Sequence, residues 1–397
     1  MRKGWVTLPL GEVFQTATGG TPPKADTALY GMFIPLVKPP ELRDGLLDSA
    51  EDGLSEAGAN VARVAPANSI LVSCIGNLGK IGRNTIPVAF NQQINAVLPN
   101  LEKAIPEFMF YQALSDTFKN QLEAFASGTT VPIVNKSKFN SIEIVLASLP
   151  EQQRIVAILD DAFDCIATAK SNAEKNLQNA RALYTSQLQS IFDRNEHDWD
   201  KSSKPLSELC DFIVDCEHKT APTQEKGIPS IRSPNIGKGK LLLQDVYRVS
   251  EETYALWTRR AEPMPGDLIL AREAPAGNVA VIPENLRVCL GQRTVLIRPD
   301  RQIFEPEFLA LTLLRPAMQQ KLLAHSRGAT VQHVNMKDIR ALDVGAIPPL
   351  GTQREIISAA DKAFQASNRL ESIYQQKLTA LDELKKSLLH QAFSGAL

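Results

Sequence analysis

Cationic and amide side chains occur in loop-like stretches of the first third of the chain, some of them beside glycines. Lysine and arginine bind phosphate oxygens, and arginine, lysine, asparagine and glutamine can hydrogen-bond the edges of bases. Gly76, Gly79 and Gly82 would let the loop around Lys80 approach a backbone closely. These residue types predict a contact surface for nucleic acid. Its candidate residues are Lys24, Lys38, Arg43, Asn77, Lys80, Arg83, Asn91, Gln92 and Gln93.

A second set with the same chemistry lies in the second half of the chain. Its candidate residues are His218, Lys219, Arg232, Lys238, Lys240, Arg272, Asn278, Gln292 and Arg293. For any single member of either set, an ordinary solvated surface group is an equally good interpretation. Asn135 and Asn335 are better explained as turn formers that bond their own backbone. The sets therefore predict two contact surfaces, with individual contacts left open.

Sequence motifs for catalysis are missing or incomplete. A phosphate-binding loop needs G-x-x-x-x-G-K-[ST], whereas the stretch 76–81 has a different spacing and no hydroxyl for magnesium. An amino-methyltransferase should show an Asn/Asp-Pro-Pro-aromatic signature, and Lys38-Pro39-Pro40-Glu41 does not match it. Nothing like G-x-S-x-G occurs. A hydrolase triad stays open, because its members need not be adjacent in sequence. We expect a non-catalytic chain without a cofactor of its own.

Zinc is a further possibility for Cys210, Cys216 and His218. Structural zinc sites usually pair their ligands in C-x₂₋₄-C knuckles and need four ligands. This spacing supplies neither feature. We therefore predict that no metal is bound.

Two long repeats must position the candidate residues. Leu149–Phe192 aligns with Leu350–Phe393 without a gap, at a constant shift from 149 to 350. Gln152 then meets Gln353, and Asp160-x-Ala162-Phe163 meets Asp361-x-Ala363-Phe364. After its opening residues, neither copy contains Pro or Gly to break a helix. Each would form a helix roughly 60 Å long at 1.5 Å per residue.

Apolar and small residues step by four and three along both copies, which is the a/d spacing of a coiled coil. We predict that the two helices pair with each other along this seam, antiparallel and within one chain. Two separate amphipathic core helices are the alternative. The predicted helix–helix interface consists of Ile155, Leu159, Ala162, Ile166, Ala169, Ala173, Ile356, Ala360, Ala363, Ser367, Leu370 and Tyr374.

The repeat continues upstream of each long helix. Pro9-Leu10-x-Glu12 answers Pro205-Leu206-x-Glu208, and residues 68–73 answer residues 266–271 as a buried strand in each half. The stretch 128–135 similarly answers 328–335. The chain is thus two copies of one module, each a globular α+β part of about 150 residues followed by a long helix. Pairing of the helices would give a pseudo-two-fold axis, which suits a roughly two-fold object such as B-DNA.

Composition limits the remaining classes. An apolar fraction of 44% and a charged fraction of 22% are typical of a globular protein. No apolar run approaches the length of a membrane span. Five cysteines at irregular spacings suit a reducing compartment, so we expect a cytoplasmic protein without membrane attachment. The net charge of −1 does not decide between acidic and basic partners, since a local patch can attract DNA.

An ordered set of these motifs resembles the specificity subunits of type I restriction–modification systems. The resemblance covers the whole chain. Its motifs are Gly19-Gly20-Thr21-Pro22, Ile34-Pro35, Gly76–Gly82, Asn91-Gln92, Ser127–Thr130 with Asn135, Leu149–Val156 and Gln391–Gly395. The second half departs from the pattern, with Asp215–Lys219 in place of the first motif and Arg272–Gly277 in place of the loop 76–82.

The resemblance implies a non-catalytic reader of a bipartite, gapped DNA target. It implies target-recognition domains at residues 1–149 and 193–349, a spacer helix at 150–192, and a second spacer helix with a C-terminal tail at 350–397. Double-stranded DNA, two methyltransferase subunits and restriction subunits are the implied partners. S-adenosylmethionine, ATP and magnesium would be bound only in those subunits. An adaptor whose paired domains bind other proteins, with no nucleic acid, is the alternative function.

Overall fold

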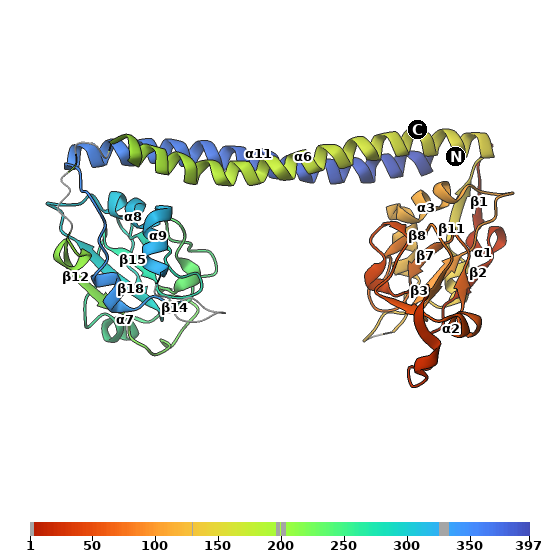
Figure 1. Ribbon diagram of the computed structural model, residues 1–397, viewed down its shortest axis with the longest axis horizontal. Coiled ribbons are helices and arrows are strands. Elements are labelled where there is room, and N and C mark those ends of the chain that lie inside the picture. The colour runs from red at the N-terminus through yellow and green to blue at the C-terminus, as the bar shows by residue number, and fades with distance from the viewer. Residues whose placement is uncertain (1–3, 129, 196–198, 200–203, 325–332) are drawn as a thin grey trace. The chain divides into compact units, whose positions relative to one another are not determined.

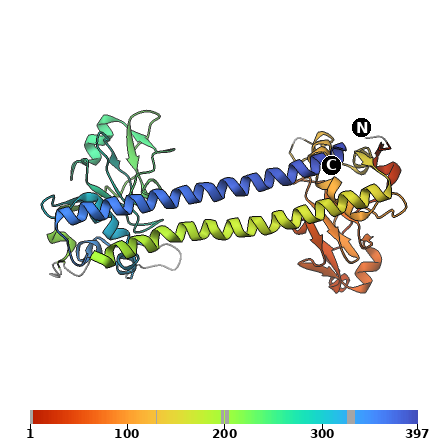
Figure 2. The ribbon, with the colours of Figure 1, turned by 90° about the horizontal axis from the view of Figure 1, so that it is seen from above.

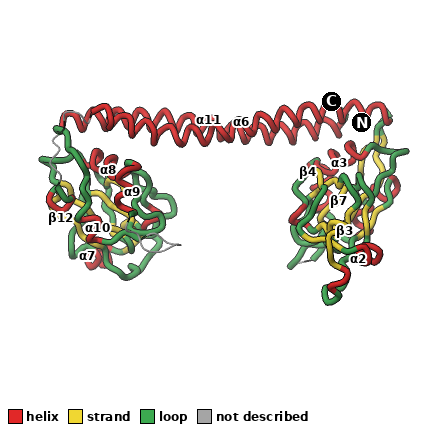
Figure 3. Tube along the Cα trace, viewed as in Figure 1, coloured by secondary structure: helices red, strands yellow, loops and turns green. Residues whose placement is uncertain are grey.

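The computed structural model describes residues 4–128, 130–195, 199, 204–324 and 333–397 (Figure 1). The chain folds into two units, Met1–Glu174 with Gln375–Leu397, and Lys175–Tyr374. The long helices α6 (Leu149–Asn195) and α11 (Leu350–Ser394) each contribute to both units. The remainder of each unit is a globular module of short strands, short helices and long loops (Figure 3).

The described part of the first module contains three sheets. A two-stranded sheet pairs β1 (Val6–Pro9) with β11 (Glu143–Leu146). The five-stranded sheet has the order β2 (Thr16–Thr18), β10 (Ile94–Val97), β7 (Ile70–Ser73), β8 (Ile81–Asn84), β4 (Gly45–Leu47). The four-stranded sheet has the order β5 (Asp52–Leu54), β3 (Tyr30–Val37), β9 (Val88–Phe90), β6 (Val64–Ala65). The short helices are α1 (Leu10–Val13), η1 (Thr27–Leu29), η2 (Pro39–Glu41), α2 (Glu56–Val61), α3 (Pro106–Leu114), α4 (Asp116–Ala124) and α5 (Lys136–Asn140).

The second module repeats the central part of this topology. Its four-stranded sheet has the order β12 (Cys210–Asp215), β18 (Thr294–Pro299), β15 (Leu268–Ala271), β16 (Val279–Val281). Its three-stranded sheet has the order β14 (Arg248–Val249), β13 (Ile228–Ile231), β17 (Cys289–Leu290). The short helices are η4 (Leu206–Glu208), η5 (Ser233–Asn235), α7 (Glu251–Trp257), α8 (Pro306–Leu314), α9 (Pro316–Leu323) and α10 (Met336–Arg340).

Strands β7 and β15 occupy the centre of the equivalent sheets, and every residue in them is buried. Their continuous apolar runs are typical of strands covered on both faces. The turn before each strand needs a left-handed residue, supplied by Asn68 (φ +68°) and Gly266 (φ +82°). The predicted buried strand in each half is therefore confirmed, and the α+β duplication with it.

The two long helices pair antiparallel in both units, side by side in Figures 1 and 2. In the first unit Lys170 Nζ lies 2.6 Å from Asp382 Oδ1. In the second unit Arg181 Nε lies 3.0 Å from Glu371 Oε2, and Ser367 Oγ donates to the Ala180 carbonyl (2.6 Å). Partner numbers on α11 fall as those on α6 rise, so the intramolecular antiparallel pair is confirmed.

All twelve residues of the predicted seam are buried or half-buried. Ile155 and Leu159 also belong to the hydrophobic cluster of the first module, and Ile356 and Ala360 to that of the second. The beginning of each helix therefore packs on its own module, whereas small residues such as Ala173 and Ser367 are buried further along.

A buried glutamine attaches the start of each long helix to its module. Gln152 Nε2 donates to the carbonyls of Lys103 (3.0 Å) and Ala147 (2.9 Å), and its Oε1 accepts from the Ile105 amide (3.0 Å). Gln353 makes the same three bonds in the second unit, to Ile303, Pro348 and the Glu305 amide, at 2.8–2.9 Å. Both side chains are fully buried. The amide thus satisfies backbone groups just before α3 and α8, where helix starts leave N–H groups unpaired.

An aromatic contact attaches the far end of each helix. Phe393 of α11 packs edge-to-face on Phe108 of α3, with ring centroids 5.2 Å apart. Phe192 of α6 stacks on Phe308 of α8 at 5.5 Å. These four residues match each other in the sequence repeat. Each helix therefore begins on one module and ends on the other.

Gln152→Leu should destabilise the first unit. The substitution leaves the Ile105 amide and two carbonyls without partners, and each unpaired buried group costs about 1–3 kcal/mol. Urea denaturation monitored by circular dichroism measures the loss. The control is Gln153→Leu, because Gln153 is exposed on the same turn. Equal midpoints for the two variants would contradict the attachment.

Candidate nucleic-acid interface

In each module, two loops meet at the ends of equivalent strands. One follows β2 or β12, and the other is the turn between β9 and β10 or between β17 and β18. In the first module Thr21 Oγ1 donates to Gln92 Oε1 (3.1 Å). In the second, Gln292 Nε2 donates to the His218 carbonyl (3.3 Å). The glutamines that match in the repeat thus join the same two loops.

Glycine makes the loop contact close in the first module. The Gly20 amide donates to the Phe90 carbonyl (2.9 Å). A Cβ placed on Gly19 would lie only 2.2 Å from the Asn91 carbonyl oxygen. No side chain fits there, which explains the glycine at position 19.

The nine first-module candidates separate into two groups. Lys24, Arg43, Asn77 and Gln92 are exposed, and Lys80 and Gln93 are half-buried. The other three have partners inside the module, and Gln92 and Gln93 each accept a hydrogen bond there as well. Lys38 pairs with Asp52, Asn91 Nδ2 donates to Gln93 Oε1 (3.0 Å), and Arg83 pairs with Glu107.

Lys80 and Arg83 differ most clearly. Lys80 ends the β7–β8 loop, in which Gly76 and Gly79 have positive φ. Ser73 Oγ holds this loop by donating to the Asn77 carbonyl (2.6 Å) and accepting from the Lys80 amide (2.9 Å). Arg83 lies on β8 and its side chain is 13% exposed, against the half-buried Glu107. Lys80 is therefore available to a ligand, whereas Arg83 supports the fold.

In the second module, His218, Lys219, Lys238, Lys240 and Arg293 are exposed. Lys240 stacks over Phe364 of α11, with Nζ 5.0 Å from the ring centroid, so it faces the helix pair. The other candidates have internal partners. Arg232 stacks on Tyr247 (4.1 Å), and Asn278 Nδ2 donates to the Ile236 carbonyl (2.9 Å).

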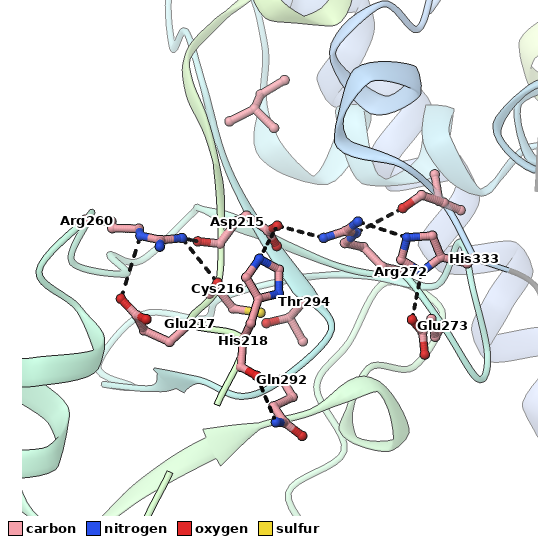
Figure 4. A network of polar contacts seen from close by, with 12 residues as sticks. Asp215, Cys216, Glu217, His218, Arg260, Arg272, Glu273, Gln292, Thr294 and His333 are labelled. Atoms are coloured by element: carbon pink, nitrogen blue, oxygen red, sulfur yellow. Dashed lines mark hydrogen bonds and ion pairs between the residues drawn. The ribbon is translucent and has the colours of Figure 1, made fainter. Parts of the chain in front are cut away.

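Arg272 is the centre of a charged group, which we call the Arg272 network: Asp215, Arg272, Glu273 and His333 (Figure 4). Arg272 is 9% exposed. Its Nη1 donates to Asp215 Oδ2 (2.7 Å) and its Nε to the Val334 carbonyl (2.9 Å). Its guanidinium is thus engaged inside the module, where it holds its neighbours, and a base contact by Arg272 stays an untested prediction.

His333 links Arg272 to Glu273. A guanidinium group can only donate, so Arg272 Nη2 donates to His333 Nε2 (3.0 Å). The ring proton therefore sits on Nδ1, which donates to Glu273 Oε1 (2.7 Å). The tautomer of the imidazole is thus set by its two partners.

Two exposed candidates are attached to this network. His218 Nε2 lies 3.2 Å from Asp215 Oδ2, and Arg293 Nε lies 2.9 Å from Glu273 Oε2. Arg260 holds the same loop from another side, donating to the Asp215 and Cys216 carbonyls (both 3.3 Å). Sequence reasoning did not select Asp215, Glu273 or His333. The departure of residues 215–219 and 272–277 from the first-module pattern was the available signal.

The two cysteines of the possible zinc site lie at different places: Cys210 is half-buried at the start of β12, and Cys216 is buried just after its end. Burial raises the pKa of the Cys210 thiol to about 12 and also raises the pKa of Cys216. Thiolate is the form that binds zinc, so these environments disfavour a zinc ligand. Within the described ranges, no three or more His, Cys, Asp or Glu side chains form a group that could hold a metal ion. The absence of a metal stays a prediction.

Comparison with known proteins assigns the chain to a family. The model of the type I restriction modification DNA specificity domain matches it twice, over residues 2–179 and 199–380. These matches cover most of the chain, so it belongs to this family, and the family resemblance seen in the sequence is confirmed. In the described parts of the chain, every helix is too short or too polar to cross a lipid bilayer.

Curated proteins similar to this chain are named as specificity subunits of type I restriction enzymes. The HindI specificity subunit of Haemophilus influenzae is 32% identical over 194 residues, 47% of this chain and 41% of that protein. The EcoBI specificity subunit of Escherichia coli is 22% identical over 334 residues, 78% of this chain and 70% of that protein. The match to the Haemophilus relative thus spans about two fifths of that protein's length.

Solved structures support the fold. The HsdS subunit from Thermoanaerobacter tengcongensis has a TM-score of 0.60 and 21% identity, over 100% of this chain and 98% of that one. A chain from a structure on complex assembly and conformational transition of the type I R-M system has a TM-score of 0.78 and 21% identity, over 100% and 99%. At this identity the likeness concerns the fold alone.

Lys80→Ala and Arg83→Ala should affect different properties, DNA binding in the first variant and stability in the second. Arg83→Ala leaves Glu107 without its partner and should lower the free energy of unfolding by about 1–3 kcal/mol. Lys80→Ala should change it by less than about 0.5 kcal/mol, as at an ordinary surface position. Lys80→Ala should instead weaken binding to duplex DNA, measured by fluorescence anisotropy. Loss of stability in Lys80→Ala with unchanged binding would reverse these roles.

Proposed function

We propose that this chain is the specificity subunit of a type I restriction–modification system and that each module reads one half of a bipartite DNA target. The supporting observation is the duplicated DNA specificity domain, with the same pair of loops joined through Gln92 in one copy and Gln292 in the other. The loops carry exposed amide and cationic groups, which are the groups that read base edges and bind phosphates.

The same loops favour DNA over a protein partner. An adaptor domain would present a broad apolar groove, because protein interfaces bury apolar surface at their centre. The exposed side chains at the loops include Gln92, His218, Lys219 and Arg293, all of them polar. Family membership points the same way.

Methyltransferase and restriction subunits complete the proposed complex. The relatives are named as specificity subunits, and a similar chain comes from work on assembly of a type I R-M system. Two methyltransferase subunits would bind the helix pair and the adjoining module faces, because a duplicated scaffold offers two equivalent docking surfaces. S-adenosylmethionine, ATP and magnesium would then be bound by the partner subunits. We place the complex in the cytoplasm.

The mass of the reconstituted methyltransferase complex tests this stoichiometry. Light scattering should give two methyltransferase subunits for each specificity chain. A comparison variant carries Phe192→Ala and Phe393→Ala. These substitutions remove the aromatic contacts of the helix ends and should reduce assembly. A stable complex with one methyltransferase subunit would contradict the two-site scaffold.

The bipartite target can be tested by changing the helices. Insertion of two heptads at matched positions of α6 and α11 should change the length of the unread spacer and leave the bases of both half-sites intact. A randomised-duplex selection on the complex with its methyltransferase measures both quantities. Insertion in only one helix is the control, because it breaks the register of the pair and should abolish selection. Altered half-site bases with an unchanged spacer would contradict this division of roles.

A further inference from the structure

The Arg272 network replaces a neutral set of residues at the same backbone positions of the first module. The amides of Cys74 and Arg272 donate to the carbonyls of Gln93 (2.8 Å) and Arg293 (2.9 Å), so the two positions are equivalent. Their carbonyls accept from Val134 (2.8 Å) and Val334 (3.0 Å) in the same way. The modules therefore share these backbone hydrogen bonds, and the side chains at the two positions differ.

Neighbouring positions change together. The isolated bridge between Ile75 and Ile133 becomes one between Glu273 and His333. At the end of the edge strand, Thr18 of β2 lies opposite Asn95, and Asp215 of β12 lies opposite Val295. Asp215 therefore occupies the position of Thr18. A buried arginine needs a partner, and here Asp215, Glu273 and His333 stand where the first module has Thr18, Ile75 and Ile133. Differences at several neighbouring positions indicate a binding site that is particular to the second module.

Two exposed side chains extend outward from this network, and both belong to the paired loops. The side chain of His218 is 69% exposed and that of Arg293 is 60% exposed, whereas Asp215 and Glu273 behind them are 16% and 18% exposed. Glu273 binds the Nε edge of Arg293. A guanidinium group carries further N–H donors on its two terminal nitrogens, and these can bind guanine O6 and N7 bidentately.

The backbone conformation of Arg293 indicates that its side chain has a role in binding. Its φ is +65°, in the left-handed region that disfavours residues with a Cβ. An exposed ion pair adds little stability, so the contact with Glu273 does not offset this strain. Strained residues of this kind cluster at binding sites.

From these observations we infer that Arg293 is a base-contacting donor of the second half-site and reads a guanine. Glu273 is the positioning residue that holds Arg293. His333 holds Glu273, and Arg272 holds His333. This inference rests on the proposed function, because it assumes that the second module reads DNA. It adds a base type and a supporting mechanism.

Arg293→Gly separates recognition from folding. Glycine accepts the left-handed backbone, so the variant should fold as well as the parent chain. In a randomised-duplex selection on the complex with its methyltransferase, preference for guanine at one position of the second half-site should fall about tenfold or more. Glu273→Gln should weaken the same preference by releasing the guanidinium. Both variants should leave the first half-site unchanged.

Arg287 supplies the matched control. It pairs with Glu251 of α7 through two contacts of 3.1 and 3.2 Å and lies outside the Arg272 network. Arg287→Gly should change neither half-site. Unchanged guanine preference in Arg293→Gly would overturn the inference. A uniform fall in affinity with a smaller salt dependence would also overturn it, because that result identifies a phosphate contact. If the parent chain selected no bipartite site, the proposed function itself would fail.

Discussion

The contact between a helix end and the α3 or α8 helix of the module that it joins determines the organisation of both units. Phe393 on Phe108 and Phe192 on Phe308 are repeat-equivalent aromatic pairs, each inside a module core. Neither unit is complete without a segment from the other half of the sequence. Antiparallel pairing follows, because a helix that begins on one module and ends on the other must run against its partner. Small residues along the seam then allow the two backbones to lie close together.

Much of this arrangement could be predicted from the sequence because its signals are local and repeated. Three signals occur once in each half of the chain: a glutamine at the start of the long helix (Gln152, Gln353), a buried strand (residues 68–73, 266–271) and the seam spacing. A pattern that is found in both copies rarely arises by chance. Long-range pairing is different. Arg83 looks like an available cation, yet its partner Glu107 is 24 positions away. Arg272 likewise pairs with Asp215, 57 positions away. Nothing in local composition reveals such partners, so individual contact residues could not be ranked.

The two modules show how one backbone carries two kinds of loop support. In the first, the loops meet through backbone atoms and through the Thr21–Gln92 contact, and Gly19 leaves no space for a side chain. In the second, Cys216 occupies the equivalent place, with its amide donating to the Thr294 carbonyl (3.2 Å) as Gly19 donates to Ile94 (3.1 Å). A Cβ at this position would collide in the geometry of the first module. The second module therefore needs a different turn, and its loops are held through side chains.

Support by charged side chains has an energetic consequence. A buried ion pair loses hydration on folding, and well-packed apolar residues of similar volume are often as stabilising or more so. Cys74 illustrates that alternative in the first module, where burial raises the pKa of the Cys74 thiol to about 12 and keeps it neutral. Stability alone therefore gives no reason for Arg272 to occupy the position of Cys74. Directed hydrogen bonds do give one, because they fix the orientation of exposed donors in a way that apolar packing cannot. The second module thus has directed hydrogen bonds where the first has neutral side chains, and these bonds orient the exposed side chains of its loops.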